Sequence, residues 1–450
     1  MYLVAGLGIT GQSVLRYFKA QGESCFAYDT REELDVSALA QQFPEVEFAT
    51  GHLPTAWITQ FETIVLSPGI AQSEPWVMNL RKLGKQVIGD IELFARAVGV
   101  PVIGITGSNG KSTVTTLTGL ALQQAGYKAA MGGNLGQPAL DLLLDETDYD
   151  VYVLELSSFQ LETTYSLQTI SSTVLNVSED HMDRYEDLED YIQAKTKVFE
   201  QTDLAVLPED FSEHGMIHHC PVVHFGLSES FKRGPDDYGV IEHQDELWLA
   251  RGQQPLVKVS DMVLQGKHHR LNALAMMALC QPFNIAPAVF QKVLSEFKGL
   301  PHRTQLVVNY KDVEWINDSK GTNVGATLTA IETMGQQARH RQGQIILLAG
   351  GVGKDADFTP LRPAVHEYCR QTIVFGRDRE QIAAALPHET VAQVETLAQA
   401  IALAAETAQA GDCVLFSPAC ASFDQFDNYA HRGKVFEQLV GEMVAAEEAR

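Results

Sequence analysis

The chain has 450 residues, of which 45% are hydrophobic and 20% are charged; this is the composition of a globular protein and excludes a disordered, tail-like one. At roughly 150 residues per domain, the length predicts about three domains. The 33 basic and 57 acidic residues give a formal net charge of −24. So acidic a protein is poorly suited to bind nucleic acid or an anionic membrane through its overall field, and an anionic ligand needs a local binding device.

The six scattered cysteines form no CxxC pair, which is typical of reduced thiols inside the cell. The chain opens on a strand-like run, Tyr2–Ala5, rather than on a basic region followed by a long apolar stretch, so no signal peptide is expected. No window reaches the roughly 18 uncharged apolar residues of a membrane helix. These features predict a soluble, cytoplasmic protein.

Short apolar runs alternate with helix-like stretches along the whole chain, a pattern typical of parallel strands covered by helices on both faces. The strands expected from this pattern are, in chain order, Tyr2–Ala5, Cys25–Tyr28, Thr63–Leu66, Val102–Ile105, Val151–Leu154, Thr173–Val177, Gln305–Asn309, Ile345–Ala349, Thr372–Phe375 and Cys413–Ser417. Helices are expected over Lys111–Ala125, ending at Gly126, and over Leu188–Glu200. Residues 205–260 are less regular. The pattern predicts an α/β fold repeated in blocks.

Two boundaries separate the predicted blocks. A short helical stretch after Ile88 precedes a fresh strand at Val102, and a Gly-Leu-Pro turn follows a helix-like run near residue 299. We therefore expect three domains, at residues 1–92, 93–299 and 300–450.

The first chemical motif is Gly6-Leu7-Gly8-Ile9-Thr10-Gly11, between a strand and a helix, with Asp29 closing the next strand. This is the spacing of a dinucleotide-binding turn, in which glycines let backbone N–H groups approach a pyrophosphate. We interpret it as a nucleotide-diphosphate site. NAD is one of the nucleotides that it could bind.

The second motif is Thr106–Thr113, between the strand Val102–Ile105 and the next helix. Ile105 stands where the first glycine of a strict G-x-x-x-x-G-K-[ST] motif would be, but the Gly-Lys-Ser portion is intact. Such a loop wraps phosphate oxygens with N–H groups, while its lysine reaches the terminal phosphates and its serine binds Mg²⁺. The motif predicts ATP or GTP binding through Gly107, Ser108, Asn109, Gly110, Lys111, Ser112 and Thr113.

Two acidic and histidine-bearing segments follow. Glu155 ends a strand beside the phosphate loop, where a carboxylate is well placed to hold Mg²⁺. His181 lies beyond the next strand and could bind a metal or a phosphate, or be an ordinary surface residue. His214, His218, His219 and Cys220 lack the spacing of a zinc site, so we interpret them as a surface loop.

Taken together, these segments resemble the Mur ligase family of ATP-dependent amide-forming enzymes. The resemblance runs from residue 3 to about 434 and is carried by Thr106–Thr113, Glu155–Glu162 (ELSSFQLE), Asn176–Tyr185 (NVSEDHMDRY), Leu300–Arg303 (LPHR), Asn317–Asn323 (NDSKGTN) and Ser417–Phe426 (SPACASFDQF). It is closest to the branch that adds D-glutamate to UDP-N-acetylmuramoyl-L-alanine. It implies a Rossmann-like N-terminal domain for the UDP precursor, a P-loop ATPase-like central domain, a Rossmann-like C-terminal domain for the amino acid, and a monomer.

The resemblance also implies roles for individual residues. The UDP precursor would contact Thr10, Gly11, Asp29, Thr30, Gly69, Asn134, Ser157, Ser158 and Gln160. Beyond the phosphate loop, ATP would contact Asn272, Arg303 and Asp318, and D-glutamate would contact Thr322, Lys354 and Ser422. The implied catalytic residues are Lys111, His181, Lys195 and Lys320. The implied Mg²⁺ ligands are Ser112, Glu155, His181 and Lys195, the last as a carbamate.

The implied reaction activates a carboxylate. The L-alanine carboxylate attacks the γ-phosphate of ATP to give an acyl phosphate, and the amine of D-glutamate then displaces phosphate. Positive charge at the junction supplies most of the catalysis because two anions must meet. One departure from the family pattern, His269 in place of asparagine, leaves the adenine-side contact at that position unassigned.

Alternative functions remain open at this point. Another Mur ligase or a folylpolyglutamate synthase-like enzyme would share the ATP-binding motif. An NAD-dependent oxidoreductase would use Gly6–Gly11 and leave Gly110-Lys111-Ser112 without a role. A non-catalytic ATP-driven switch would not require Lys354 and Ser422.

Overall fold

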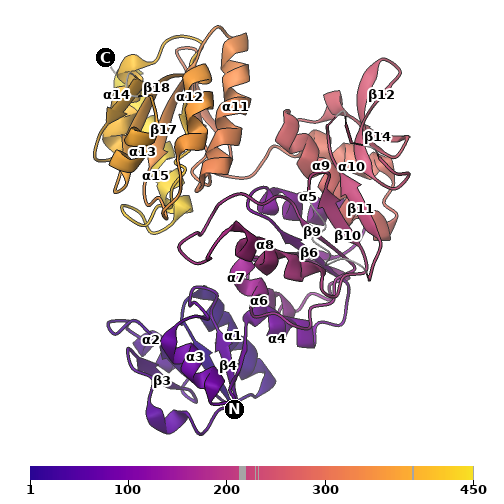
Figure 1. Ribbon diagram of the computed structural model, residues 1–450, viewed down its shortest axis with the longest axis vertical. Helices are drawn as coiled ribbons and strands as arrows, with labels where there is room; N and C mark the ends of the chain where they lie inside the picture. The colour runs from indigo at the N-terminus through magenta and orange to yellow at the C-terminus, as the bar shows by residue number, and fades with distance from the viewer. Residues whose placement is uncertain (212–218, 229, 232, 388–389, 449–450) are drawn as a thin grey trace. The chain divides into compact units, whose positions relative to one another are not determined.

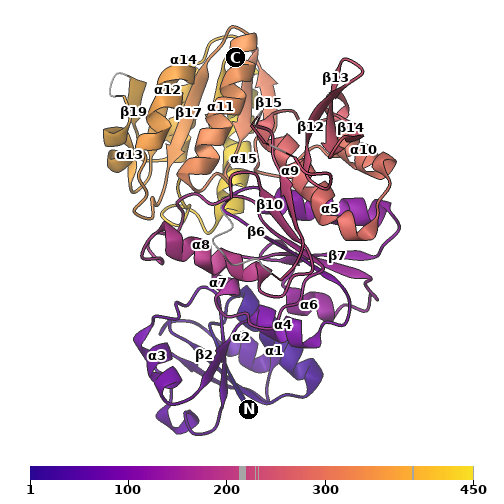
Figure 2. The ribbon, with the colours of Figure 1, turned by 45° about the vertical axis from the view of Figure 1, so that its right-hand side comes forward.

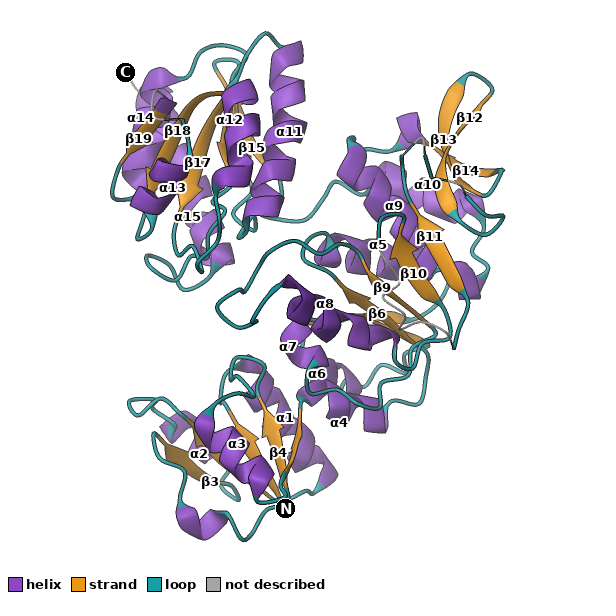
Figure 3. Cartoon of the chain, in the orientation of Figure 1, coloured by secondary structure: helices purple, strands orange, loops and turns teal. Residues whose placement is uncertain are grey.

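The computed structural model describes the chain except for residues 212–218, 229, 232, 388–389 and 449–450 (Figure 1). The chain divides into two compact units. The first comprises residues 1–177 and 189–297, and the second comprises residues 178–188 and 298–450. Within the described residues, the strands form three sheets flanked by helices, which Figure 3 distinguishes by colour. The fold is therefore α/β, as predicted.

The N-terminal sheet has the order β3-β2-β1-β4-β5, and its strands pair in parallel. Its elements are β1 (Tyr2–Ala5), α1 (Ile9–Gln21), β2 (Cys25–Asp29), α2 (Ser37–Gln42), β3 (Glu47–Thr50), β4 (Thr63–Leu66), α3 (Pro75–Lys82) and β5 (Gln86–Ile88). Successive residues of β1 enter different cores: Val4 packs with α1, whereas Leu3 and Ala5 pack on the face that α3 covers. The apolar run of this strand thus reflects burial on both faces.

The central sheet has the order β14-β13-β12-β11-β10-β9-β6-β8-β7. Its strands are β6 (Val102–Thr106), β7 (Ala129–Gly133), β8 (Val151–Glu155), β9 (Ser171–Val174), β10 (Ala205–Pro208), β11 (Val222–Phe225), β12 (Tyr238–His243), β13 (Glu246–Arg251) and β14 (Gln254–Lys258). Helix α4 (Asp90–Ala97) connects the N-terminal sheet to this sheet. The other helices of this part are α5 (Lys111–Gln124), α6 (Ala139–Leu143), α7 (Ser158–Leu161), α8 (Leu188–Thr196), α9 (Lys267–Leu279) and α10 (Pro287–Glu296). β12, β13 and β14 form an antiparallel meander within the stretch predicted to be irregular.

The C-terminal sheet, in the second unit, has the order β15-β16-β20-β17-β18-β19. Its elements are β15 (Gln305–Tyr310), β16 (Val313–Asn317), α11 (Val324–His340), β17 (Ile345–Gly350), α12 (Arg362–Tyr368), β18 (Cys369–Phe375), α13 (Arg379–Ala385), β19 (Val391–Gln393), α14 (Leu397–Thr407), β20 (Cys413–Phe416) and α15 (Tyr429–Glu448). Helices α11, α12 and α13 cover one face and α14 and α15 the other, as can be followed in Figure 2.

Several predicted elements differ from the structure at their ends, among them the strand predicted at Thr372–Phe375, which is β18 (Cys369–Phe375); two of the others have a clear local cause. The strand expected at Thr173–Val177 is β9 (Ser171–Val174), because the chain turns toward the phosphate loop after it: the Asn176 carbonyl accepts the Ser108 N–H at 2.9 Å. The helix expected at Leu188–Glu200 ends at Thr196 and tightens into a 3₁₀ turn over Lys197–Phe199. Both differences lie at the ends of elements, where local pattern carries the least information.

Candidate active site

The phosphate-binding loop joins β6 to α5 in the first unit. Gly107 and Gly110 have φ angles of 142° and 84°, which side chains other than glycine rarely adopt. A Cβ atom on Gly110 would lie 2.8 Å from the Asn272 side-chain oxygen, so this glycine also permits close packing against α9. Ile105, at the position of the missing motif glycine, is a fully buried residue of β6. The departure from the strict motif thus lies in the strand and leaves the phosphate nest intact.

Lys111 folds back over this loop. Its Nζ donates to the carbonyl oxygens of Gly107 at 2.7 Å and Ser108 at 2.9 Å. The ammonium group is therefore held beside the loop that would surround the phosphates, as its predicted role requires.

Ser112 and Glu155 meet beside the loop. The Ser112 hydroxyl donates to Glu155 Oε2 at 2.5 Å, and the Asn134 side chain donates to Glu155 Oε1 at 2.7 Å. Because β6, β8 and β7 are neighbours in the sheet, their carboxyl ends bring these three residues to one edge. Mg²⁺ prefers hard oxygen ligands and usually retains several waters, so one hydroxyl and one carboxylate suit it beside phosphate oxygens.

Lys195 also reaches the phosphate loop. Its side chain is almost fully buried, its Nζ donates to the Gly107 carbonyl at 3.0 Å, and the same nitrogen lies 4.2 Å from the centre of the Tyr191 ring. In the sequence, only the family resemblance distinguishes Lys195 from Lys197, which lies on the same predicted helix. The fold distinguishes them, because Lys197 instead donates to the Glu162 carbonyl.

Asn176 is a residue of this site whose role sequence reasoning missed. Its side chain accepts the Asn109 N–H at 2.8 Å and donates to the Asn109 carbonyl at 3.0 Å. It thereby fixes the tip of the phosphate loop from the adjacent strand end. In the sequence, its position just after a buried strand could have indicated this role.

The glycine-rich turn of the N-terminal sheet is held by Asp29. Its buried carboxylate accepts the Leu7 N–H at 2.7 Å and the Arg31 guanidinium at 2.8 Å. Burial would raise the pKa of Asp29, but hydrogen bonds from Arg31 and Leu7 and the charge of Arg31 together lower it to about 2. Asp29 is thus an anion that shapes the turn. Thr10 and Gly11 lie at the start of α1, and Thr30 is exposed beside Asp29.

Other predicted precursor residues lie near these two turns. Gly69 is exposed in the loop after β4, and a Cβ on Gly6 would lie 2.6 Å from the Ser67 side chain of the same loop. Ser157 caps α7 and exchanges hydrogen bonds with Gln160, which also donates to Asp90 at 3.4 Å. Ser158 is the buried first residue of α7.

Three loops of the second unit lie at the carboxyl ends of β16, β20 and β17. The Ala419 N–H donates to the Gly321 carbonyl at 2.8 Å, and Val352 and Ala421 exchange two backbone hydrogen bonds of 2.9 Å. These hydrogen bonds hold the three loops together at one edge of the sheet. The loops carry the three predicted amino-acid ligands, Thr322, Lys354 and Ser422.

A buried arginine supports two of these loops. Arg432, at the start of α15, is 0% exposed and donates to the Ser319 carbonyl at 2.8 Å and to the Cys420 carbonyl at 3.1 Å. Sequence reasoning missed it, since an arginine on an amphipathic helix is usually exposed.

Asp318, predicted to contact ATP, is buried in the same region. It accepts hydrogen bonds from the Ser417 hydroxyl at 2.7 Å and the Thr304 N–H at 3.0 Å. Burial raises the pKa of Asp318 to about 6, against the opposing effects of these hydrogen bonds and of the Arg303 charge. Lys320 lies 4.4 Å from the centre of the Tyr429 ring.

The segment Ser178–Leu188 belongs to the second unit and carries Asp180 and His181. Asp180 pairs with Lys354 and accepts a hydrogen bond from Asn323 at 3.1 Å, while His181 Nε2 lies 3.8 Å from Asp180 Oδ2. Burial would raise the pKa of Asp180, but the charges of Lys354 and His181 and the two hydrogen bonds lower it to about 2. Of the predicted Mg²⁺ ligands, Ser112, Glu155 and Lys195 belong to the first unit and His181 to the second.

Asn272, His269 and the histidine-bearing loop are the remaining candidates. Asn272 packs against the phosphate loop, and the ring centres of His269 and His268 lie 3.8 Å apart with their planes tilted by 46°. Burial lowers the pKa of His269 to about 3, so this imidazole is neutral near pH 7. His214 and His218, of the segment interpreted as a surface loop, lie outside the described residues. Among the described ones, no group of three or more histidine, cysteine, aspartate or glutamate side chains could hold a metal ion.

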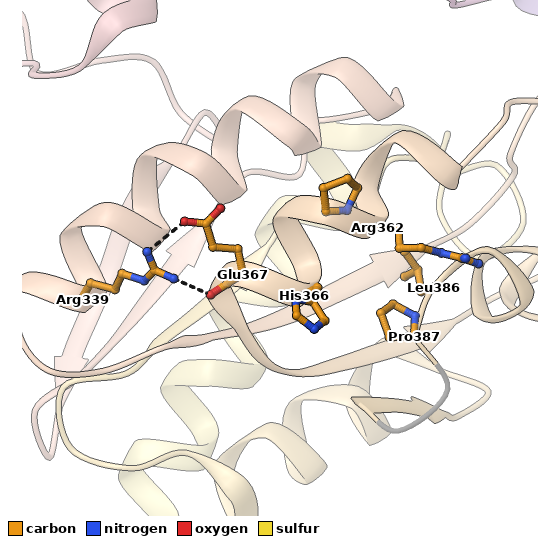
Figure 4. A pocket seen from close by; sticks show the side chains of 7 residues that line it. Arg339, Arg362, His366, Glu367, Leu386 and Pro387 are labelled. Atoms are coloured by element: carbon orange, nitrogen blue, oxygen red, sulfur yellow. Dashed lines mark hydrogen bonds and ion pairs between the residues drawn. The ribbon is translucent and has the colours of Figure 1, made fainter.

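A hollow of about 930 Å³ lies elsewhere in the second unit and contains none of the predicted residues (Figure 4). It is lined by Arg339, which pairs with Glu367, and by His366 and Pro387. Among the residues that the structure describes, no helix is long and apolar enough to cross a membrane.

Three sequence profiles match successive parts of the chain. The Mur ligase MurD-like N-terminal domain matches residues 1–89, the Mur ligase middle domain matches residues 105–280, and the Mur ligase glutamate ligase domain matches residues 302–420.

Full-length relatives agree with these profiles. The chain is 59% identical to a UDP-N-acetylmuramoylalanine--D-glutamate ligase of Hydrogenovibrio crunogenus, over 99% of both chains. It is 43% identical to the ligase of the same name from Nitrosococcus oceani, over 98% of this chain and 97% of that one.

Solved structures share the fold at lower sequence identity. A pseudomurein peptide ligase type C from Methanothermus fervidus superposes with a TM-score of 0.63 at 17% identity, covering 98% of this chain and 99% of the other. The UDP-N-acetylmuramate-alanine ligase MurC of Thermotoga maritima gives a TM-score of 0.61 at 18% identity, with the same coverage.

Proposed function

The chain belongs to the Mur ligase family, and from that premise we propose that it joins D-glutamate to UDP-N-acetylmuramoyl-L-alanine during synthesis of peptidoglycan precursors. The observation that carries the proposal is the 59% identity, over 99% of the chain, with a ligase of that name. The enzyme is an ATP-dependent ligase that forms an amide bond. The two reaction steps follow from the chemistry of its substrates.

In the first step, an oxygen of the L-alanine carboxylate attacks the γ-phosphorus of ATP. The bond from that phosphorus to ADP breaks, and an acyl phosphate forms. In the second step, the amine of D-glutamate attacks the acyl carbon, phosphate leaves, and the nitrogen loses a proton. Activation is needed because a free carboxylate is a poor electrophile.

The phosphate loop would bind ATP through its N–H groups. Lys111 would turn from the Gly107 and Ser108 carbonyls toward the terminal phosphates and stabilise the charge that develops during transfer. We propose that one Mg²⁺ binds to Ser112 and Glu155, that a second binds near His181, and that Lys195, as a carbamate, helps to hold Mg²⁺. When bound, these ions would neutralise phosphate oxygens.

The amino-acid site would use cations and hydroxyls against the two carboxylates of D-glutamate. Lys354, Thr322 and Ser422 lie on loops that are hydrogen-bonded to one another, so their spacing is well defined. Lys320 would add positive charge near the reacting phosphate. Arg303, Asp318 and Asn272 would contact ATP.

Each of the three predicted domains has its own substrate in this proposal. We propose that residues 1–92 bind the UDP precursor, residues 93–299 bind ATP and Mg²⁺, and residues 300–450 bind D-glutamate. The UDP precursor would lie on Thr10, Gly11, Asp29, Thr30 and Gly69, with its peptide end directed toward Asn134, Ser157, Ser158 and Gln160. Because one chain carries all these residues, we propose that the enzyme is a monomer. We also propose that it acts in the cytoplasm.

A phosphate-release assay tests the function directly. Purified protein is given ATP, Mg²⁺ and UDP-N-acetylmuramoyl-L-alanine, with each candidate amino acid in turn. Phosphate release that requires D-glutamate, together with a product heavier by one glutamyl residue, supports the proposal. Release with another amino acid, release without the precursor, or binding of NADH in a fluorescence titration would contradict it.

A further inference from the structure

Lys354, the proposed ligand of a substrate carboxylate, already binds a carboxylate of the chain itself. We propose that Asp180 is a built-in competitor of the amino-acid substrate, which occupies Lys354 until D-glutamate displaces it. This inference rests on the proposed function, because it concerns the same amino-acid site.

The contacts of Asp180 resemble those that a bound carboxylate would make. One oxygen is paired with the Lys354 ammonium group and the other accepts the Asn323 amide at 3.1 Å. The side chains of Asp180 and Lys354 are only 9% and 15% exposed, so the pair is largely shielded from water. A shielded ion pair with a second hydrogen bond is stronger than an exposed one.

The space around this pair is too small for the substrate. The cavity next to it measures about 10 Å³ and is lined by Glu179, His181, Met182, Thr322, Gly353 and Ala419, among others. Measured in the same way, a cavity needs about 10–15 Å³ to hold one water molecule. A glutamate molecule cannot enter unless part of this lining moves.

The segment that carries Asp180 is the part best suited to move. The loops that carry Thr322, Lys354 and Ser422 are joined by backbone hydrogen bonds. By contrast, residues 178–187 form neither helix nor strand, and the chain on both sides of the segment belongs to the other unit. A displacement of that unit would therefore pull directly on Asp180.

Exchange of one carboxylate for another explains why the pairing is useful. A buried ammonium group without a counter-ion is costly, so the site is best kept filled before the substrate arrives. Asp180 fills it with the functional group that D-glutamate brings. Anions that bind Lys354 less well than Asp180 would be excluded.

The decisive variant is Asp180→Asn, which keeps the shape of the side chain and removes its charge. If Asp180 competes with the substrate, the KM for D-glutamate should fall by about tenfold, the effect of losing one charge-assisted interaction. The KM for ATP should stay unchanged. If the variant has little turnover, equilibrium dialysis with labelled D-glutamate should show the same gain in affinity.

A second variant acts on the same contact from the other side. Asn323 also caps α11 by accepting the Ala326 N–H at 2.8 Å, and serine is an equally good cap. Asn323→Ser should therefore keep the helix cap and lose the amide that holds Asp180. We expect a smaller fall in the KM for D-glutamate, in the same direction.

A matched control is Glu367→Gln, which removes one acidic charge from an exposed ion pair of the same unit. Its KM for D-glutamate should equal that of the unmodified enzyme. An unchanged or higher KM in Asp180→Asn would overturn the competitor role; a higher value would indicate that Asp180 binds the substrate's ammonium group. Failure of the unmodified enzyme to use D-glutamate would instead refute the proposed function.

Discussion

Lys111 and Lys195 donate to the same oxygen, the carbonyl of Gly107, at 2.7 and 3.0 Å. Their nitrogens are therefore at most about 6 Å apart, a distance at which two positive charges repel by on the order of 3 kcal/mol at an effective dielectric constant of about 20. One of the two, Lys195, is almost fully buried. The arrangement places two positive charges close together beside one carbonyl.

Conversion of Lys195 to a carbamate would replace this repulsion by attraction and create a ligand for Mg²⁺. We therefore expect Lys195→Ala to lose at least about a hundredfold in kcat, and added short carboxylates to restore part of it. Steady-state rates with and without acetate or formate measure the effect.

The neighbouring Lys197→Ala provides the control, because Lys197 donates to the Glu162 carbonyl instead. Its activity should not respond to added carboxylates. Near-normal activity of Lys195→Ala, with no response to carboxylates, would rule out the carbamate.

Lys111→Ala tests the phosphate loop itself. The change removes the charge that stabilises the transferred phosphoryl group, so kcat should fall by about 10²–10³-fold. The exposed Lys128→Ala should leave phosphate release unchanged. A Lys111→Ala enzyme with ordinary turnover would disprove the role of this loop in catalysis.

Glu155→Gln tests the proposed magnesium site. Glutamine can still accept the Ser112 hydroxyl, but it has no negative charge to hold the ion. The Mg²⁺ concentration for half-maximal phosphate release should rise by about tenfold or more. The exposed Glu146→Gln should behave like the unmodified enzyme, and an unaltered Mg²⁺ dependence of Glu155→Gln would argue against this ligand.

Asp90 predicts a pH dependence of stability. Burial raises its pKa to about 6, although hydrogen bonds from Gln160 and nearby N–H groups oppose the rise, and Oδ1 has no hydrogen-bond partner among the described residues. An unfolded aspartate has a pKa of about 3.9. The folded state thus binds more protons between these values, and the contribution of Asp90 to stability falls as pH rises through about 6.

Asp90→Asn removes this titration. The free energy of unfolding of the variant, relative to the unmodified protein, should increase by about 1 kcal/mol between pH 5 and pH 7. Urea unfolding at the two pH values measures it. A pH-independent difference for Asp90→Asn would mean that its carboxyl is not perturbed.

The proposed roles of the phosphate loop in the first unit and of Lys354, Thr322 and Ser422 in the second predict closure on ligand binding. Small-angle scattering should give a smaller radius of gyration when ATP analogue, UDP precursor and D-glutamate are all present than in their absence. A radius that does not change would count against closure.

Most strands and the two motif loops could be predicted from the sequence. Val102–Ile105 and Val151–Leu154 are continuous apolar runs because both faces of each strand are buried, and glycines mark the phosphate loop because its φ angles require them. Strands such as Glu47–Thr50 and Val391–Gln393 were missed. They lie at sheet edges, are partly exposed, and so lack the apolar pattern.

Candidate site residues could be predicted from the sequence where they lie in one short motif. Gly110-Lys111-Ser112 is such a motif, since its backbone and side chains lie in a single turn. Contacts between residues that are distant along the chain could not be predicted in this way. Arg432 beneath two loops, Asn176 against Asn109, and Asp180 on Lys354 all resemble ordinary polar residues in the sequence. Their roles arise only when the folded sheets bring separate strand ends together and exclude water from the charges between them.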